Sequence, residues 1–292
     1  MNAVVSATKK SDFVTAPFGM PVGDVMEIIR RDGGIVLEGV LSCDEVRQVN
    51  DELDPYLYDY HTGSQGGDEL MKEFWGALTK RLTNVVVLSP TYRERFLSRP
   101  ELHDYMSAMF KGVSDSFWVQ ATQAIEIMPG EKAQMLHRDV GNYPVFTQFG
   151  PSAPEVTCNT LLALVDTDEA CGATRVIPGS HEWDAEREYD DSMTVPAELK
   201  AGSIFFYSGK LLHGGGANRS EDVRRRVIAT AFNAGFLVPE EAYPFTVPLE
   251  LARTMPKRLQ QALGFRSFHQ RDPIGGSLWQ HNYEELADFL GL

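Results

Sequence analysis

The stretch FWVQATQAIEI, residues 117–127, marks a change along the chain from helical spacing of apolar residues to a spacing close to two. Four more β-prone runs follow it, and most of them lie near Gly, Pro or Asp, as short strands do. These runs span residues 159–165, 174–180, 202–207 and 225–232. A helical first third followed by at least five short strands predicts a β-barrel or double-sheet jelly roll backed by helices.

The N-terminal third favours helices. Residues 22–31, VGDVMEIIRR, carry apolar residues at helical spacing, and the DGG that follows predicts the end of this helix. Ser42 and Glu45 have the S-x-x-E spacing of a capping box, which predicts a second helix over residues 43–57. The rest of this third is expected to form a loosely held arm at 1–20, a short strand at 35–40, a flexible loop at 61–69 and two short helices within 89–110.

The composition is that of a globular protein with one core. Its 292 residues are 43% hydrophobic and show no repeat or convincing linker, so we expect a single domain over residues 1–292. The formal net charge of -14 argues against nucleic acid and anionic membranes as partners, because both require a basic face.

The cysteines and the N-terminus indicate a cytoplasmic protein. Cys43, Cys158 and Cys171 are odd in number and lack CxxC spacing, which favours free thiols in a reducing compartment and excludes a zinc ribbon. The N-terminus has no apolar signal-peptide core, and no stretch is long and apolar enough to span a bilayer.

A candidate metal site begins in QMLHRDVGNY, residues 134–143. Side chains at i and i+2 of a strand point to the same face, so His137 and Asp139 can converge on one point. His213, which precedes three glycines, is the candidate third ligand. Two histidines and one carboxylate form the ligand set of non-haem Fe(II) oxygenases, which leaves positions open for a co-substrate and O2. The arginines at 224–226 open the next strand, and a guanidinium can clamp a carboxylate.

Two other interpretations of this pattern stay open. The same three residues could hold Zn2+ and activate water for hydrolysis. The chain could also be a catalytically silent barrel that acts as a partner subunit or small-molecule binder. His181 is expected to be a structural turn residue, and no iron ligand is expected among His61, His103, His269 and His281.

Several motifs in order resemble one family. They are DGGIVLEGVLSCDEVRQVNDEL (32–53), TKRLTNVV (79–86), QMLHRD (134–139), GATRVIPGSHEW (172–183) and GSIFFYSGKLLHGGGAN (202–218), followed by the arginine run. Over most of its length the chain resembles the phytanoyl-CoA dioxygenase (PhyH) family of Fe(II)/2-oxoglutarate oxygenases. Within that family it is similar to the fungal enzymes that tailor meroterpenoids and indole alkaloids.

The resemblance implies an α+β fold built on a double-stranded β-helix, a cupin-like jelly-roll barrel. It also implies that His137, Asp139 and His213 hold Fe(II), and that 2-oxoglutarate and O2 are co-substrates. The positions matching the family's 2-oxoglutarate pocket are Arg81, Gln134, Thr174 and Arg225. Strand alternation places Arg225 on the face of Val227, away from Arg224 and Arg226, but a bulge would exchange them, so the choice stays open.

The resemblance further implies an oxidoreductase of secondary metabolism that oxidises a C–H bond of a bulky apolar natural product, such as a meroterpenoid or a related terpenoid or alkaloid. Hydroxylation, desaturation, rearrangement and endoperoxidation are all possible outcomes. Met135, Tyr143, Phe146 and Phe232 are candidate pocket residues, although core packing is the safer expectation for Phe232. Residues 61–76 and 265–282 are expected to form either a lid or surface loops around a buried Trp279. A homodimer is also implied.

Overall fold

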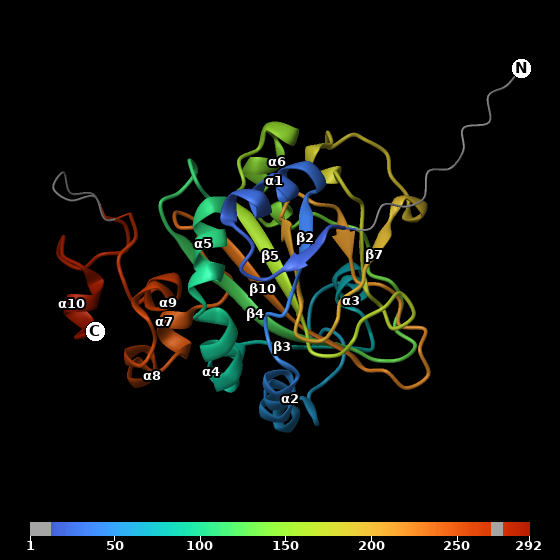
Figure 1. Cartoon of the computed structure of the whole chain (residues 1–292), viewed down its shortest axis with the longest axis horizontal. Coiled ribbons are helices and arrows are strands. Elements are labelled where there is room, and N and C mark those ends of the chain that lie inside the picture. Colours follow the sequence, from blue (N-terminus) through green and yellow to red (C-terminus); the bar gives the residue numbers. More distant parts are fainter. Residues whose placement is uncertain (1–12, 270–276) are drawn as a thin grey trace, which may run out of the picture.

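Two β-sheets form the centre of the computed structural model, which describes residues 13–269 and 277–292 (Figure 1). The larger sheet has seven strands in the order β1 (Thr15–Pro17), β2 (Gly34–Glu38), β8 (Ile204–Ser208), β5 (Thr157–Ala163), β10 (Arg225–Ala234), β4 (Phe117–Ile127), β3 (Thr79–Leu82). The smaller has three, in the order β7 (Val195–Ala197), β6 (Thr174–Val176), β9 (His213–Gly214). All neighbours pair antiparallel except β1 and β2. The fold is the expected jelly roll backed by helices, although the two sheets do not join into one closed barrel.

The central strands of the larger sheet are buried on both faces, as β5 is at every position. Alternation along β10 divides its side chains between two cores. Ile228 and Phe232 face the helices, whereas Val227 faces the space between the two sheets. A register shift between β10 and β4 lies at Ala231/Phe232, beyond the point at which Arg225 enters the strand. Arg225 therefore shares the inner face with Val227.

Helices cover the outer face of the larger sheet (Figure 1). They include α1 (Val22–Asp32), α2 (Cys43–Leu57), α4 (Val85–Leu88), a π-helix (Tyr92–Leu97), α5 (Pro100–Met109), α7 (Tyr243–Thr246), α8 (Leu249–Arg253) and α9 (Lys257–Ala262). The C-terminal α10 (Leu286–Leu290) lies farther from the sheet (Figure 1), and Arg253 of α8 donates to its Leu290 carbonyl oxygen. The capping box at Ser42 and Glu45 is formed, so the expected helix boundaries are confirmed. Of two further helices, α3 (Glu69–Trp75) contributes no residue to this helix-side core, whereas α6 (Pro144–Thr147) packs Phe146 against it.

The expectation of a loose arm at residues 1–20 is wrong for its described part. Thr15–Pro17 forms β1 and pairs with β2, which buries Ala16. Residues 1–12 lie outside the described residues. Arg81, one of the positions expected in the 2-oxoglutarate pocket, lies on β3.

The cysteines are free, as expected. Across residues 13–269 and 277–292, every helix is too short or too polar to cross a bilayer.

Candidate active site

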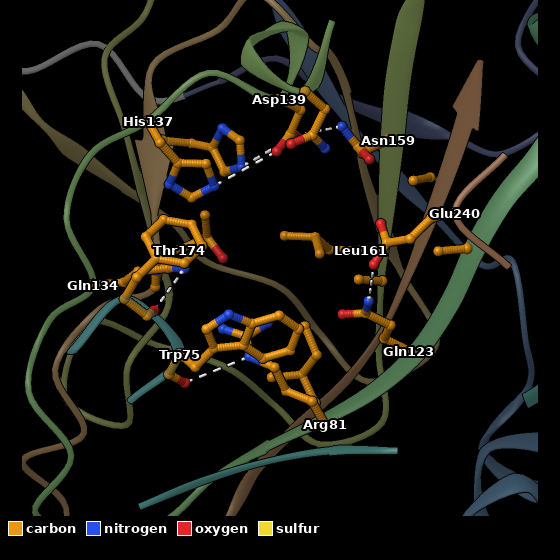
Figure 2. Close-up of a pocket in the computed structure, with 18 of the residues that line it drawn as sticks. Trp75, Arg81, Gln123, Gln134, His137, Asp139, Asn159, Leu161, Thr174 and Glu240 are labelled. Atoms are coloured by element: carbon orange, nitrogen blue, oxygen red, sulfur yellow. Dashed lines mark hydrogen bonds and ion pairs between the residues drawn. The ribbon is translucent and has the colours of Figure 1, made fainter. Parts of the chain in front are cut away.

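Three side chains that are distant in sequence meet between the two sheets (Figure 2). One potential ligand atom from each of His137, Asp139 and His213 lies within 4.8 Å of the other two. Nε2 of His137 is 3.5 Å from Oδ1 of Asp139, and Nε2 of His213 is 3.4 Å from Oδ2. Two imidazole nitrogens and a carboxylate therefore converge, and this donor set fits a divalent transition metal.

The backbone fixes the distance between the two histidines. His137 and His213 form an antiparallel bridge, with N···O distances of 2.9 and 3.0 Å in the two directions. Asp139 begins a short 3-10 turn, so the expectation that His137 and Asp139 share one regular strand is wrong. The first glycine after His213 permits this approach, because a Cβ at Gly214 would lie 2.9 Å from the carbonyl oxygen of Gln134.

Hydrogen bonds orient each member of the triad. Nδ1 of His137 lies 3.0 Å from the Met135 carbonyl oxygen, and Nδ1 of His213 lies 3.0 Å from that of Leu211. Each contact leaves Nε2 available to face Asp139. Asn159 donates from Nδ2 to Oδ2 of Asp139 at 2.7 Å. Sequence reasoning missed Asn159, whose only signal was its position as a polar residue at the start of the β-prone run at 159–165.

Burial and mutual charge act in opposite directions on the triad. Burial would lower the pKa of His137, but the hydrogen bond and charge of Asp139 raise it above its ordinary value. Burial lowers the pKa of His213. Burial would raise the pKa of Asp139, but the two histidines and Asn159 hold it below its ordinary value. The site therefore presents an ionised carboxylate between two imidazoles.

Two arginines reach a cavity of about 280 Å³ next to the triad. Arg225 is buried and donates from Nη2 to Oγ1 of Thr174 at 2.8 Å, while its Nε has no hydrogen-bond partner. Nε of Arg81 lies 3.5 Å from the Trp75 carbonyl oxygen, and its guanidinium stacks over the Trp75 ring. Burial lowers the pKa of each arginine to about 10. Neither forms an ion pair with the acidic groups of the described residues, so the cavity is suited to an anion.

The structure distinguishes the three consecutive arginines. Arg226 lies on the outer face, where it pairs with Glu126 at 2.6 Å and Asp54 at 2.7 Å. Arg224 is exposed. Of the three, only Arg225 lines the cavity.

Gln134 connects two walls of the cavity. Its Oε1 accepts from the Gly215 amide at 3.0 Å, and its Nε2 donates to the Phe74 carbonyl oxygen at 3.2 Å. Phe74 belongs to α3, whose Met71 and Trp75 also line the cavity. Residues 69–75 of the expected lid therefore do lie at the site.

Other expected pocket residues are placed elsewhere. Phe232 packs in the helix-side core, and Met135 is 51% exposed. Phe146 lines a second cavity, and the Tyr143 hydroxyl donates to the Val238 carbonyl oxygen. Trp279 packs edge-to-face on Trp118 and is 46% exposed, so it is neither part of this cavity nor buried. Residues 270–276 of the tail lie outside the described part of the chain.

Two of the remaining histidines are buried and contact backbone carbonyl oxygens. His181 is buried, with Nε2 3.0 Å from the Arg30 carbonyl oxygen. Nε2 of His103 lies 2.9 Å from the carbonyl oxygen of Leu97. Within residues 13–269 and 277–292, the triad is the one group of at least three His, Cys, Asp or Glu side chains close enough to hold a metal ion.

Comparison with known proteins gives one family match, to phytanoyl-CoA dioxygenase (PhyH) over residues 29–227. The dioxygenase FUM3 of Gibberella moniliformis is 39% identical, and the alignment covers 100% of this chain and 97% of that protein. The multifunctional dioxygenase prhA of Penicillium brasilianum is 32% identical, with 92% and 91% covered. Among solved structures, the non-heme alpha-ketoglutarate-dependent epimerase SnoN from nogalamycin biosynthesis aligns with a TM-score of 0.56 at 20% identity, covering 73% of this chain and 80% of that one. HygX from Streptomyces hygroscopicus, with nickel, 2-oxoglutarate and hygromycin B bound, has a TM-score of 0.56 at 16% identity, covering 74% and 88%. These structural likenesses establish a shared fold.

Proposed function

The chain belongs to the phytanoyl-CoA dioxygenase family of non-haem iron, 2-oxoglutarate-dependent dioxygenases, and from this premise we propose that it oxidises a C–H bond of a bulky, largely apolar natural product. The observation that carries the proposal is the pairing of a His-Asp-His donor set with two cavity arginines that lack a carboxylate partner among the described residues. This pairing suits a metal ion beside a dianion such as 2-oxoglutarate.

In this proposal Nε2 of His137, Nε2 of His213 and a carboxylate oxygen of Asp139 hold the iron. Bound Fe(II), together with 2-oxoglutarate and O2, supplies the oxidant that removes hydrogen from carbon. Asn159 keeps the carboxylate of Asp139 in place.

The co-substrate would lie against the arginines. Arg225 is placed to grip its distal carboxylate, and the hydroxyl of Thr174 holds the guanidinium in position. Arg81 adds a second positive charge, and Gln134 is proposed to hydrogen-bond the co-substrate. The polar face of the cavity thus orients 2-oxoglutarate, while the apolar walls are left for the substrate.

The substrate proposal is supported by those walls. Met71, Phe74 and Trp75 of α3 line the cavity together with Leu161 and Ile125 of the sheet. The fungal dioxygenase relatives support a natural product of secondary metabolism, such as a meroterpenoid or a related terpenoid or alkaloid. Hydroxylation, desaturation, rearrangement and endoperoxidation all begin from the same removal of hydrogen.

Addition of Fe(II) and 2-oxoglutarate under anaerobic conditions tests the proposal. The wild-type protein should develop the weak visible metal-to-ligand charge-transfer band and should form succinate when air is admitted. The His137→Ala variant should show neither. A well-folded wild-type protein without the band and without succinate would overturn the proposal. A zinc hydrolase would be indifferent to 2-oxoglutarate, and family membership does not support that alternative or a silent barrel.

We also propose that the protein is cytoplasmic and works as a homodimer. The free thiols of Cys43, Cys158 and Cys171 support a reducing compartment. Light scattering coupled to size-exclusion chromatography tests the dimer, because a molar mass equal to that of one chain would contradict it. The single domain over residues 1–292 also stays a prediction.

A further inference from the structure

One acidic side chain of the cavity has no role in holding iron or 2-oxoglutarate. Glu240 follows β10 and lines the cavity together with Gln123 of β4. Figure 2 shows these two side chains next to each other, on the wall opposite His137 and Gln134. Nε2 of Gln123 donates to Oε1 of Glu240 at 3.4 Å. Among the described residues, no Lys, Arg or His forms an ion pair with this carboxylate.

The neighbouring Glu241 has a structural role, because its carboxylate accepts hydrogen bonds from the backbone. Glu241 accepts from the Thr122 amide at 2.6 Å and from the Asn84 amide at 2.9 Å, and so ties the segment to β4 and α4. Within the described part of the chain, the carboxylate of Glu240 has only the long contact with an uncharged amide, and the residue is exposed. The fold therefore leaves its hydrogen-bonding capacity for a ligand.

The surroundings of Glu240 favour a positively charged ligand. Burial by the adjacent protein and the charge of Asp139 raise the pKa of Glu240, and Arg81 offsets only part of this effect. A cation next to this carboxylate would offset the cost of removing its charge from water, whereas an anion would add to that cost.

The floor between Glu240 and the triad is low and apolar. Ala229 pairs with Gln123 on one side and Leu161 on the other, and Ala231 lies between Ala121 and Asn159, which bonds the triad. Alanine side chains leave room for a hydrocarbon skeleton that reaches from the metal ligands to Glu240. A ligand that fits both features has an apolar body and a cationic hydrogen-bond donor.

We propose that Glu240 is a substrate-recognition residue that binds an ammonium group of an otherwise apolar substrate, and that Gln123 holds the carboxylate in place. This inference rests on the proposed function and adds a substrate class to it: an aliphatic or alicyclic amine. Contact of the ammonium with Glu240 also sets which carbon lies next to the iron ligands.

Isothermal titration with three probes of equal length, octylamine, octan-1-ol and octanoate, tests the inference, with 2-oxoglutarate in excess so that Arg81 and Arg225 are not free to bind octanoate. Wild-type protein should bind octylamine more tightly than octan-1-ol and should bind octanoate least. Glu240→Gln should weaken octylamine binding on the order of tenfold to hundredfold, because a charge-assisted hydrogen bond is lost. Glu240→Lys should reverse the order of octylamine and octanoate. Glu221→Gln, a loss of the same charge at an exposed position outside the cavity, should match the wild type.

Failure of the two proposals can be told apart because octylamine is titrated with and without Fe(II) and 2-oxoglutarate. Wild-type protein without the charge-transfer band but with Glu240-dependent octylamine binding would overturn the proposed oxygenase alone. Wild-type protein with the band, but with octylamine binding that is absent or unchanged in Glu240→Gln and Glu240→Lys, would overturn the recognition role alone. Equal or tighter binding of octanoate to the wild type would also overturn it.

Discussion

Replacement of Arg225 by methionine should remove the affinity for 2-oxoglutarate without loss of stability. Arg225 is buried, donates one hydrogen bond to Thr174 and leaves Nε without a partner. A bidentate grip on a carboxylate would comprise two charge-assisted hydrogen bonds of about 1.5–3 kcal/mol each, or about 3–6 kcal/mol together. At about 1.4 kcal/mol for each factor of ten, the dissociation constant should rise by roughly 10² to 10⁴.

The free energy of unfolding should respond differently, because methionine fills a similar volume and removes a buried charge that has no counter-charge among the described residues. The melting temperature of Arg225→Met should therefore be unchanged or higher. Affinity is measured by anaerobic titration of 2-oxoglutarate into the Fe(II) protein, followed by the charge-transfer band. Stability is measured on the same preparation by thermal unfolding.

Arg226→Met is the matched control, because it removes the same charge from the other face of the same strand. Among the residues that the structure describes, it leaves the buried Glu126 with Lys80, at 3.8 Å, as its remaining ion-pair partner. Breaking a buried pair in this way costs about 3–5 kcal/mol of stability, and 2-oxoglutarate affinity should be kept below the lowered melting temperature. Wild-type affinity in Arg225→Met, or loss of affinity in folded Arg226→Met, would refute the assignment.

Three further predictions follow from the triad and from buried histidines. His213→Ala should lose the charge-transfer band, whereas His181→Ala should lower the melting temperature and keep the band; equal loss in both variants would contradict the ligand set. Asn159→Ala should weaken Fe(II) binding about tenfold to hundredfold, because Asp139 loses its 2.7 Å hydrogen bond. Competition with a fluorescent chelator would measure the dissociation constant of Fe(II). An unchanged value would show that Asn159 does not position the carboxylate. Burial lowers the pKa of His103 to about 4, so the folded protein keeps this side chain neutral while the unfolded chain takes up a proton below pH of about 6.5. Above that pH His103 does not reduce the free energy of unfolding. As the pH falls towards 4, protonation of the unfolded chain lowers the free energy of unfolding, by about 2 kcal/mol at pH 5. Urea unfolding at pH 7 and pH 5 should show a smaller loss in His103→Phe than in the wild type, and equal losses would exclude His103 as the source.

The sequence predicted those helices and strands that are determined by interactions between residues close together in the chain. The helix over 43–57 was predicted with its correct ends, because the capping box acts within one turn. The strand at 117–127 was predicted with its correct ends, because its length reveals a period. Strands of two to four residues, such as β3 and β9, carry no readable period, and their existence depends on pairing with neighbours that are distant in sequence.

In the candidate site, too, some residues could be predicted from sequence motifs and others only from the three-dimensional arrangement. His137, Asp139 and His213 were chosen by residue type and order, and the structure brings them together, while their role as ligands stays a prediction. Proximity in sequence gave wrong pocket residues, because Met135 is near the triad along the chain but is half exposed. Glu240 carries no motif, and only the three-dimensional arrangement places its carboxylate in the cavity.

The paired backbone bonds between His137 and His213 separate two tasks within one cavity. The two imidazoles are attached to backbone segments that are hydrogen-bonded to each other. The distance between them therefore does not depend on which side chains line the rest of the cavity. Substitution of side chains on α3 or around residue 240 can then change which substrate binds without changing the positions of the metal ligands. A scaffold of this kind can diversify its chemistry by altering its lining while its centre stays constant.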